Sequence, residues 1–404
     1  MYIKRKLEEV VLQTAAAFPV VLVTGPRQVG KTTMLRRIAE KNRKYISLDN
    51  PMARDLAIND PGLFIQRYAP PVLIDEVQYA PELLTHIKIH VDNSHKKGDF
   101  WLTGSQMFHL MNNVSESLAG RVGIINMLGL SNSEILNNDF NEYTTSFDDL
   151  MEKVKDAVPQ SLTDIFQRIY KGSMPALYST PQSVEMFYSS YVNTYLQRDI
   201  RDLNQVGDMS SFLRFLTCCA ARTSQMVNYS EIAKDVDISS PTAKKWLSLL
   251  VSSGIVTLIE PYFNNALKRI IKAPNMYFLD TGLCAYLTRW TNPEALEVSA
   301  MAGAFFETFV VSEIVKSYYN AGKRAPLFYY RDTDQKEIDL ILENNGVLCP
   351  IEIKKSGNPK RAAIRHFKVL DKTALAVGEG NVICLCPDLT PIDKMNSLVP
   401  VWLV

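Results

Sequence analysis

Short apolar segments alternate with helix-like stretches through residues 19–130. The segments are PVVLVTG, YISLD, PPVLIDE, DFWLTGS and GIINML. Strands that are apolar on both faces are typical of the interior of a parallel sheet, and the helices between them supply the crossovers that parallel strands require. Residues 1–139 are therefore predicted to form an α/β domain with a parallel sheet at its core.

Two later regions depart from this alternation. Residues 140–208 are polar and helical, without apolar segments as strong as the earlier ones, which predicts a helical connector or lid. In residues 291–404, the helix-like segment FFETFVVSEIVKSYY precedes several strand-like segments. That order is typical of an α+β unit.

Between these regions, residues 209–290 predict a winged helix-turn-helix unit, because three short helices precede a strand-turn-strand pattern. Ser230 is placed to cap the helix EIAKDV. Ser239 or Ser240, followed by Pro241, starts the helix PTAKKWLSLLVSSG. The two strands of the wing are expected at IVTLIE and KRIIKA.

Composition and charge exclude few function classes. The 404 residues are 47% hydrophobic, and 44 Lys and Arg nearly balance 43 Asp and Glu, so no whole-chain positive field indicates nucleic acid or an acidic membrane. The first residues lack the apolar core of a signal peptide, and no run of 18 apolar residues occurs, which predicts a soluble cytoplasmic protein without a membrane partner. Six cysteines without a CxxC pair favour reduced thiols, with disulfides and zinc as open alternatives.

The segment TGPRQVGKTT carries the most specific chemistry, because it follows the strand VVLV and precedes the helix-like MLRRIAEK. Gly25, Gly30, Lys31 and Thr32 complete the G-x-x-x-x-G-K-[ST] pattern of a phosphate-binding loop. Backbone N–H groups and Lys31 are expected to bind the phosphates of ATP, and the Thr32 hydroxyl to bind Mg²⁺. The predicted nucleotide-binding residues are Gly25, Pro26, Arg27, Gln28, Val29, Gly30, Lys31, Thr32 and Thr33.

A pair of acids follows the buried strand PPVLIDE. Asp75 is expected to hold Mg²⁺, directly or through water, and Glu76 to orient or deprotonate the attacking water. The alternative is that both acids cap the next helix. Because the strand YISLD intervenes in sequence, the strand of Asp75 is predicted not to be the direct successor of the loop strand. That order favours the branch of P-loop proteins with an extra central strand and a catalytic glutamate.

Two further groups are predicted near the nucleotide. Ser105 or Thr103, at the end of DFWLTGS, would contact the γ-phosphate or the attacking water as a sensor. Arg121 would neutralise charge in the transition state, in cis or from a neighbouring subunit of a homo-oligomer. A structural salt bridge is the alternative for Arg121. No N-K-x-D motif for guanine is present, which favours adenine.

These motifs carry a family resemblance. GPRQVGKTT, LIDEVQ, LTGSQ and LAGRV, in this order, resemble the bacterial and archaeal ATPase family that joins an AAA-type P-loop core to a C-terminal domain of unknown function. KGSMPALY, YLQRDIRDL, YFLDTGL, YYRDTDQKEIDLILE and IEIKKS resemble later segments of the same family, so the similarity spans nearly the whole chain. The resemblance implies an ATP-binding protein whose C-terminal part is similar to a restriction-endonuclease-like fold.

The predicted recognition helix offers a weak surface for DNA. Its outer face is expected to present Thr242, Lys244, Lys245 and Ser248, and its buried face Trp246, Leu249 and Leu250. Lys268, Arg269 and Lys272 in the wing add three cations that can meet phosphates. A protein-binding module and an ATPase lid remain alternatives.

A carboxylate hairpin is predicted in the last unit. If Asn345 and Gly346 form a type I′ turn, residue pairs whose numbers sum to 691 face each other, and Asp339 opposes Glu352. Opposed like charges destabilise a strand pair unless a cation lies between them, and Mg²⁺ is the expected cation.

This arrangement, with Lys354 beside it, resembles the PD-(D/E)xK nuclease core, and Glu307 matches the helix carboxylate of that family. The resemblance implies a second Mg²⁺ or Mn²⁺ held by Glu307, Asp339 and Glu352, with Lys354 orienting water. A relic without activity is the alternative.

The sequence therefore predicts an ATP-hydrolysing protein that acts on nucleic acid through its C-terminal units. A nucleotide-gated switch that binds a protein partner and a metal-dependent DNA endonuclease remain the alternatives.

Overall fold

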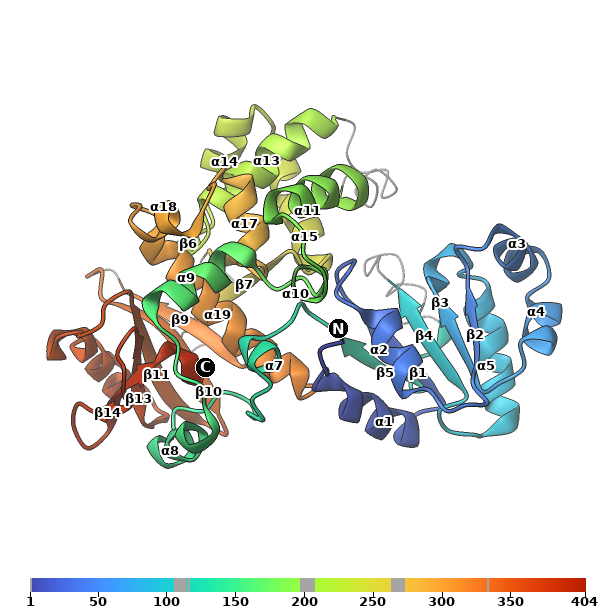
Figure 1. The fold of residues 1–404 in the computed structure, drawn as a ribbon, viewed down its shortest axis with the longest axis horizontal. Coiled ribbons are helices and arrows are strands. Elements are labelled where there is room, and N and C mark those ends of the chain that lie inside the picture. The colour runs from blue at the N-terminus through green and yellow to red at the C-terminus, as the bar shows by residue number, and fades with distance from the viewer. Residues whose placement is uncertain (1, 105–113, 115–116, 197–207, 263–272, 333) are drawn as a thin grey trace.

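The computed structural model describes residues 2–104, 114, 117–196, 208–262, 273–332 and 334–404. An N-terminal sheet and a C-terminal group of strands lie at opposite ends of the molecule, with helices between and above them (Figure 1). Among the described helices, none is both long enough and apolar enough to cross a bilayer.

Five parallel strands of the described residues form the N-terminal sheet, in the order β2-β3-β4-β1-β5. Their bounds are β1 (Val20–Thr24), β2 (Lys44–Ser47), β3 (Val72–Asp75), β4 (Phe100–Gly104) and β5 (Val122–Asn126). The surrounding helices are α1 (Leu7–Ala17), α2 (Lys31–Ile38), α3 (Pro51–Asn59), α4 (Pro61–Arg67) and α5 (Leu83–Ser94). Every residue of β1, β3 and β4 is buried, as expected for strands covered on both faces. The predicted α/β fold is confirmed, and β4 lies between β1 and β3 as the extra central strand.

Helices follow the sheet. They are α7 (Asn132–Leu136), α8 (Phe147–Asp156), α9 (Leu162–Lys171), α10 (Ala176–Ser179) and α11 (Val184–Ser190), and a π-helical turn covers Tyr191–Leu196. Serine hydroxyls accept first-turn N–H groups at the starts of α7, α8, α9 and α11, which explains where these helices begin. The helical character predicted for residues 140–208 is confirmed in its described part.

The next unit consists of α13 (Met209–Ala221), β6 (Gln225–Met226), α14 (Tyr229–Val236), α15 (Ser240–Ser252), β7 (Val256–Pro261) and β8 (Asn275–Phe278). Ser239 caps α15 as predicted, but Ser230 does not cap α14. Asn228 caps α14, because its extended backbone turns its side chain towards the N–H groups of Ser230 and Glu231. The predicted strand KRIIKA lies almost wholly outside the described residues, and the strand that pairs with β7 is β8.

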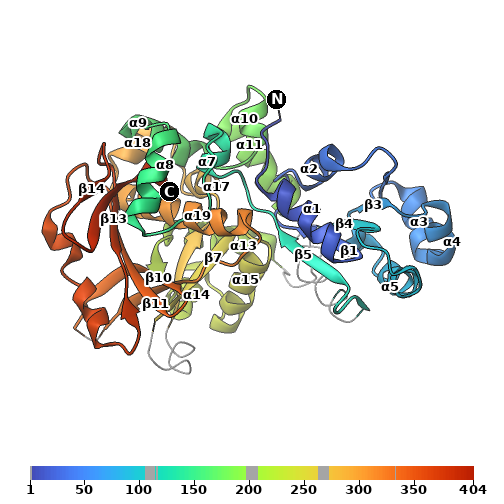
Figure 2. The same cartoon turned by 90° about the horizontal axis from the view of Figure 1, so that it is seen from below.

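The C-terminal part contains three α-helices, three short 3-10 helices and seven strands within the described residues. The α-helices and strands are α17 (Thr281–Leu287), α18 (Pro293–Glu297), α19 (Ala302–Asn320), β9 (Leu327–Arg331), β10 (Glu337–Asn344), β11 (Val347–Lys354), β12 (Ala376–Val377), β13 (Gly380–Cys384), β14 (Thr390–Pro391) and β15 (Asn396–Pro400). β7 pairs with both β8 and β9, so one sheet continues through the predicted units 209–290 and 291–404. Their boundary stays a prediction, as do the boundaries of residues 1–139 and 140–208. A hydrogen bond from the N–H of Asn132 to Glu313 Oε2 joins α7 to α19, and both helices lie between the two groups of strands (Figure 2).

The hairpin register predicted from the sequence is confirmed. Asn345 and Gly346 have φ values of 49° and 80°, the left-handed conformation that a type I′ turn needs at both positions. Leu340 pairs with Ile351 and Leu342 with Cys349, so the pairs sum to 691.

Candidate functional site

Residues 25–30 wrap tightly between the end of β1 and the start of α2. Gly25 and Gly30 have φ values of 139° and 94°. A Cβ at Gly25 would overlap the carbonyl oxygen of Met127, so this turn requires glycine for space as well as for conformation. The predicted loop therefore has the close backbone approach that a phosphate cradle needs.

Lys31 and Thr32 begin α2 and lie beside Asp75. Lys31 is 6% exposed, and its Nζ donates to the carbonyl oxygens of Gly25 at 2.9 Å and Pro26 at 2.7 Å. Thr32 Oγ1 donates to Asp75 Oδ1 at 2.6 Å. A cation and two hard oxygen donors are thus concentrated at the amino end of one helix, where the helix dipole is positive.

Asp75 accepts hydrogen bonds from three side chains around the site. It ends β3, is 6% exposed, and accepts hydrogen bonds from Thr32, from Thr103 on β4, and from Tyr45 Oη on β2 at 3.2 Å. The sequence argument missed Tyr45, since only the β2–β3 register brings that hydroxyl to the acid. Donors from one helix and two strands fix the position of the carboxylate.

Glu76 adopts a left-handed backbone conformation with φ of 58°. Its N–H donates to Thr103 Oγ1 at 3.1 Å, and its carboxylate accepts a hydrogen bond from Gln78 Nε2. A non-glycine residue in this conformation costs about 1–2 kcal/mol, and such strain concentrates at functional sites. Glu76 does not cap a helix through its side chain, which weakens the capping alternative.

The two sensor candidates differ in their outcome. Thr103 contacts both acids. Its hydroxyl donates to Asp75 and accepts from the N–H of Glu76. Ser105 lies outside the described residues and stays a prediction.

Arg121 lies at the amino ends of the strands, whereas the nucleotide loop lies at their carboxyl ends. It precedes β5, and its carbonyl accepts from the N–H of Val20 at the first residue of β1, whereas the nucleotide loop follows the last residue. The five residues of β1 place its two ends about 16 Å apart. Arg121 Nε instead pairs with Asp92 Oδ1 at 2.5 Å, so the predicted role in cis is wrong. The role in trans stays a prediction.

A cavity of about 1190 Å³ opens over the loop. Loop residues, Lys31, Thr32, Thr33 and Glu76 line it together. Its apolar lining comes from segments far apart in sequence, namely Tyr2, Ile3, Met127, Leu130, Pro175, Ala176, Met186, Phe187 and Tyr191. Apart from Pro175 and Ala176 in the segment KGSMPALY, these residues lie in no quoted motif, and none of them was predicted to line the site. The cavity is large enough for a nucleotide with its base and phosphates.

The oxygen donors of Thr32 and Asp75 suit Mg²⁺, a hard cation that keeps several waters and needs few protein ligands. Across the described residues, no group of three or more His, Cys, Asp or Glu side chains is arranged to hold a metal ion.

A second polar cluster lies on the β10–β11 hairpin. Lys354 Nζ is 2.6 Å from Glu352 Oε1 and 3.7 Å from Asp339 Oδ2, and the N–H of Ile353 donates to Asp339 at 2.7 Å. The cation that the opposed carboxylates require is thus Lys354 in this structure. The charge of Lys354 favours the ionised form of both carboxyl groups, but it does not offset their burial, because the pKa of each is raised.

Glu307 on α19 completes this cluster. Tyr277 Oη donates to its carboxylate at 2.8 Å and Ser224 Oγ at 2.9 Å, two partners that the sequence argument missed because they lie on other elements. Burial, together with the charge of Asp339, raises the pKa of Glu307 to about 8. The same two causes raise the pKa of Glu352 to about 7, and burial raises the pKa of Asp339.

The outer face of α15 agrees with the prediction. Lys244, Lys245 and Ser248 are exposed and Thr242 is half-buried, while Trp246, Leu249 and Leu250 are buried. Lys268, Arg269 and Lys272 lie outside the described residues. The carboxyl end of α15 meets the nucleotide loop, since a Cβ at Gly254 would lie 2.9 Å from Pro26 Cγ.

Comparisons with known proteins match the chain in three parts. A family model described as an AAA domain matches residues 17–136, and two described as domains of unknown function, DUF8612 and DUF4143, match residues 162–294 and 302–404. Uncharacterised proteins of Mycobacterium tuberculosis and Mycobacterium bovis are each 30% identical over 358 residues, covering 87% of this chain and 74% of the relative. A solved structure, the Walker-type ATPase of Pyrococcus abyssi, is 16% identical and covers 71% of this chain and 96% of its own, with a TM-score of 0.42.

Proposed function

This chain belongs to the family of AAA-type P-loop ATPases that carry the C-terminal domain of unknown function DUF4143, and from that premise we propose that it hydrolyses ATP with Mg²⁺ at residues 25–33. The observation that carries the proposal is the contact between Thr32 and Asp75 beside Lys31, with Glu76 lining the same cavity. The cavity thus combines phosphate-binding, metal-binding and proton-accepting groups.

Each group has a distinct task. The loop N–H groups and Lys31 bind the phosphates, and Lys31 exchanges its contacts with the loop carbonyls for phosphate oxygens. Thr32 and Asp75 hold Mg²⁺, which supplies charge neutralisation and orients the phosphates. Glu76 accepts the proton of the attacking water, while Thr103 holds Asp75 and the backbone of Glu76 in place. The apolar lining from Tyr2 to Tyr191 suits a purine base, and the missing N-K-x-D motif favours adenine.

Steady-state phosphate release, measured with and without DNA over a range of protein concentrations, tests this function. We expect hydrolysis that DNA accelerates. Slow hydrolysis that DNA leaves unchanged would favour the nucleotide-gated switch with a protein partner. A rate per molecule that rises with protein concentration would support Arg121 acting in trans within a homo-oligomer.

Lys31→Ala is expected to weaken the binding of ATP. The variant removes one charge-assisted contact worth about 1.5–3 kcal/mol, so the dissociation constant should rise about 10- to 150-fold. Isothermal titration calorimetry with Mg·ATP measures it. Lys44→Ala on β2 removes a lysine whose Nζ contacts Arg67 O and serves as the control. Equal affinities of wild type and Lys31→Ala would contradict the assignment.

Action on nucleic acid is supported by the C-terminal units. The order α13-β6-α14-α15-β7-β8, with β8 between β6 and β7, supports a winged helix, and α15 presents Lys244 and Lys245 to solvent. The mixed sheet with Glu307, Asp339, Glu352 and Lys354 resembles the nuclease core. We propose that these units contact DNA, and that the acid cluster takes up Mg²⁺ or Mn²⁺ when Lys354 turns away.

Nicking of supercoiled DNA in Mg²⁺ or Mn²⁺ tests the nuclease alternative. Asp339→Ala should lower nicking at least about tenfold, the lower end of what a lost metal-orienting group costs. Asp388→Ala, which replaces an exposed acid of the same domain, is the control. Equal nicking by wild type and Asp339→Ala would show that the cleavage comes from a contaminant.

A further inference from the structure

Arg5 is a buried arginine next to the nucleotide loop. It is 2% exposed, and its guanidinium donates to the carbonyl oxygens of Val29 at 2.8 Å, Leu128 at 2.8 Å and Gly129 at 3.3 Å. Its Nε pairs with Glu134 Oε1 at 3.0 Å. One planar group therefore joins the loop, through Val29, to the segment that leaves β5.

Glu134 extends this contact into α7. Its Oε2 accepts from the N–H of Ser131 at 2.9 Å, and the Ser131 hydroxyl accepts from the N–H of Glu134, a reciprocal capping box. Oε1 also accepts from the N–H of Lys6 at 3.0 Å. Residues 128–134 are thus held as one unit by Arg5 and by the cap.

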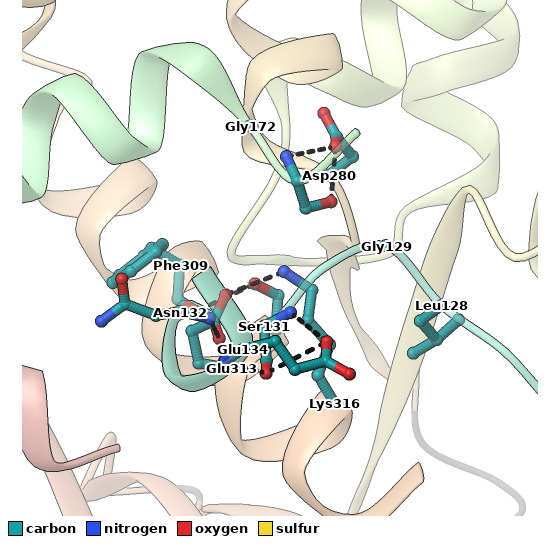
Figure 3. Close-up of polar contacts among 12 residues, drawn as sticks. Leu128, Gly129, Ser131, Asn132, Glu134, Gly172, Asp280, Phe309, Glu313 and Lys316 are labelled. Carbon is teal, nitrogen blue, oxygen red and sulfur yellow. Dashed lines mark hydrogen bonds and ion pairs between the residues drawn. The ribbon is translucent and has the colours of Figure 1, made fainter. Parts of the chain in front are cut away.

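The same unit is joined to α19 (Figure 3). The N–H of Asn132 donates to Glu313 Oε2 at 2.7 Å, and Lys316 Nζ donates to Glu313 Oε1 at 2.8 Å. Asn320 donates to the Ser131 hydroxyl at 3.3 Å. Glu313 and Lys316 are 4% and 3% exposed on their side chains, so solvent does not compete for these contacts.

α19 carries Glu307 about 9 Å along its axis from Glu313, at 1.5 Å per residue. Hydrogen-bond networks and rigid secondary elements can carry coupling between distant sites, and α19 is one continuous helix between Glu307 and Glu313. A change in the position of Val29 thus has a continuous, buried and hydrogen-bonded route to the acid cluster. Each step of the route is a hydrogen bond or a helical segment within the described residues.

We propose that Arg5 is a positioning residue of the nucleotide loop and that residues 128–134 transmit the state of this loop to α19 and Glu307. The proposal rests on the proposed nucleotide binding at residues 25–33. It assigns to the C-terminal domain a dependence on nucleotide that requires no direct contact between the two polar clusters.

Hydrogen exchange of the full-length protein, followed by mass spectrometry, tests the proposal. The probe is a non-hydrolysable ATP analogue with Mg²⁺, added to saturation. In wild type, we expect slower exchange in the loop, in α7 and along α19 from Glu313 to Glu307, the last by about fivefold or more. In Arg5→Lys, the loop slows but α19 does not, because one ammonium group cannot span three carbonyls and Glu134.

Arg43→Lys is the matched control. Arg43 is also an arginine of this domain with a buried side chain, and its Nε lies 2.7 Å from Glu40 while its Nη2 donates to Gly98 O at 2.9 Å. It precedes β2, the strand at the far edge of the sheet from β5. It should keep the response of α19. Glu313→Gln tests the far end, and should keep protection of the loop while losing it in α19.

Three results would overturn the proposal. The first is an α19 response in Arg5→Lys and Glu313→Gln equal to that of wild type, and the second is equal loss in Arg43→Lys. The third is protection of the wild-type loop without any response of α19. If the wild-type loop itself gains no protection, the proposed nucleotide binding fails, and this proposal fails with it.

Discussion

Replacing Glu76 by glutamine should leave ATP binding intact and lower the turnover number by about 10²- to 10⁴-fold, the usual contribution of a positioned general base. The amide keeps the size of the side chain and can still hydrogen-bond Gln78, but it cannot accept the proton of the attacking water. The strained backbone of Glu76 and its anchor on Thr103 lie outside the side chain, so the variant should fold as wild type does.

Phosphate release under saturating ATP, together with a titration of Mg·ATP binding, measures both halves of this prediction. Glu82→Gln is the matched control, since Glu82 is an exposed acid just before α5. Unchanged hydrolysis in Glu76→Gln would remove Glu76 from its role. Loss of binding as well as of turnover would assign the residue to the metal or to the fold instead.

Local motifs predicted the nucleotide loop because its chemistry depends on consecutive residues. The loop chemistry comes from residues close together in sequence, namely Gly25, Gly30, Lys31 and Thr32. The hydropathy pattern predicts the strand before the loop and the helix after it. The hairpin register was predictable for the same reason, since a two-residue turn fixes the pairing of the strands on both sides.

Contacts between distant segments could not be predicted in this way. Tyr45 reaches Asp75 only through the order of strands, and Tyr277 reaches Glu307 only through the packing of α19 on β8. The position of Arg121 relative to the nucleotide was predicted wrongly. The sequence shows that an arginine precedes a strand, but not that this end of the strand lies away from the nucleotide loop. Arg5 lies in a charged segment near the N-terminus that contains no motif. It is buried because Val29, Leu128 and Glu134, which are distant in sequence, contact its side chain.

The acid cluster should make the protein less stable at high pH. Burial raises the pKa of Glu307 to about 8 and that of Glu352 to about 7, from the ordinary glutamate pKa of 4.5. A carboxyl group whose pKa is raised by folding holds its proton more tightly in the folded state. Its stabilising contribution is complete below the unfolded pKa and is lost as the pH rises through the folded pKa.

Between about pH 5.5 and about pH 8.5, the free energy of unfolding of this region should therefore fall by about 2–5 kcal/mol, at about 1.4 kcal/mol per pKa unit with partial solvent screening. Glu307→Gln should remove much of this slope, because a glutamine still accepts hydrogen bonds from Tyr277 and Ser224 but cannot ionise. Calorimetric unfolding at both pH values measures the effect, with Glu231→Gln, an exposed glutamate of α14, as the control. A slope that Glu307→Gln leaves unchanged would show that Glu307 is already ionised at neutral pH. The ionised carboxylates would then require a cation of higher charge than Lys354. In the proposed nuclease core, that cation would be a bound divalent metal ion.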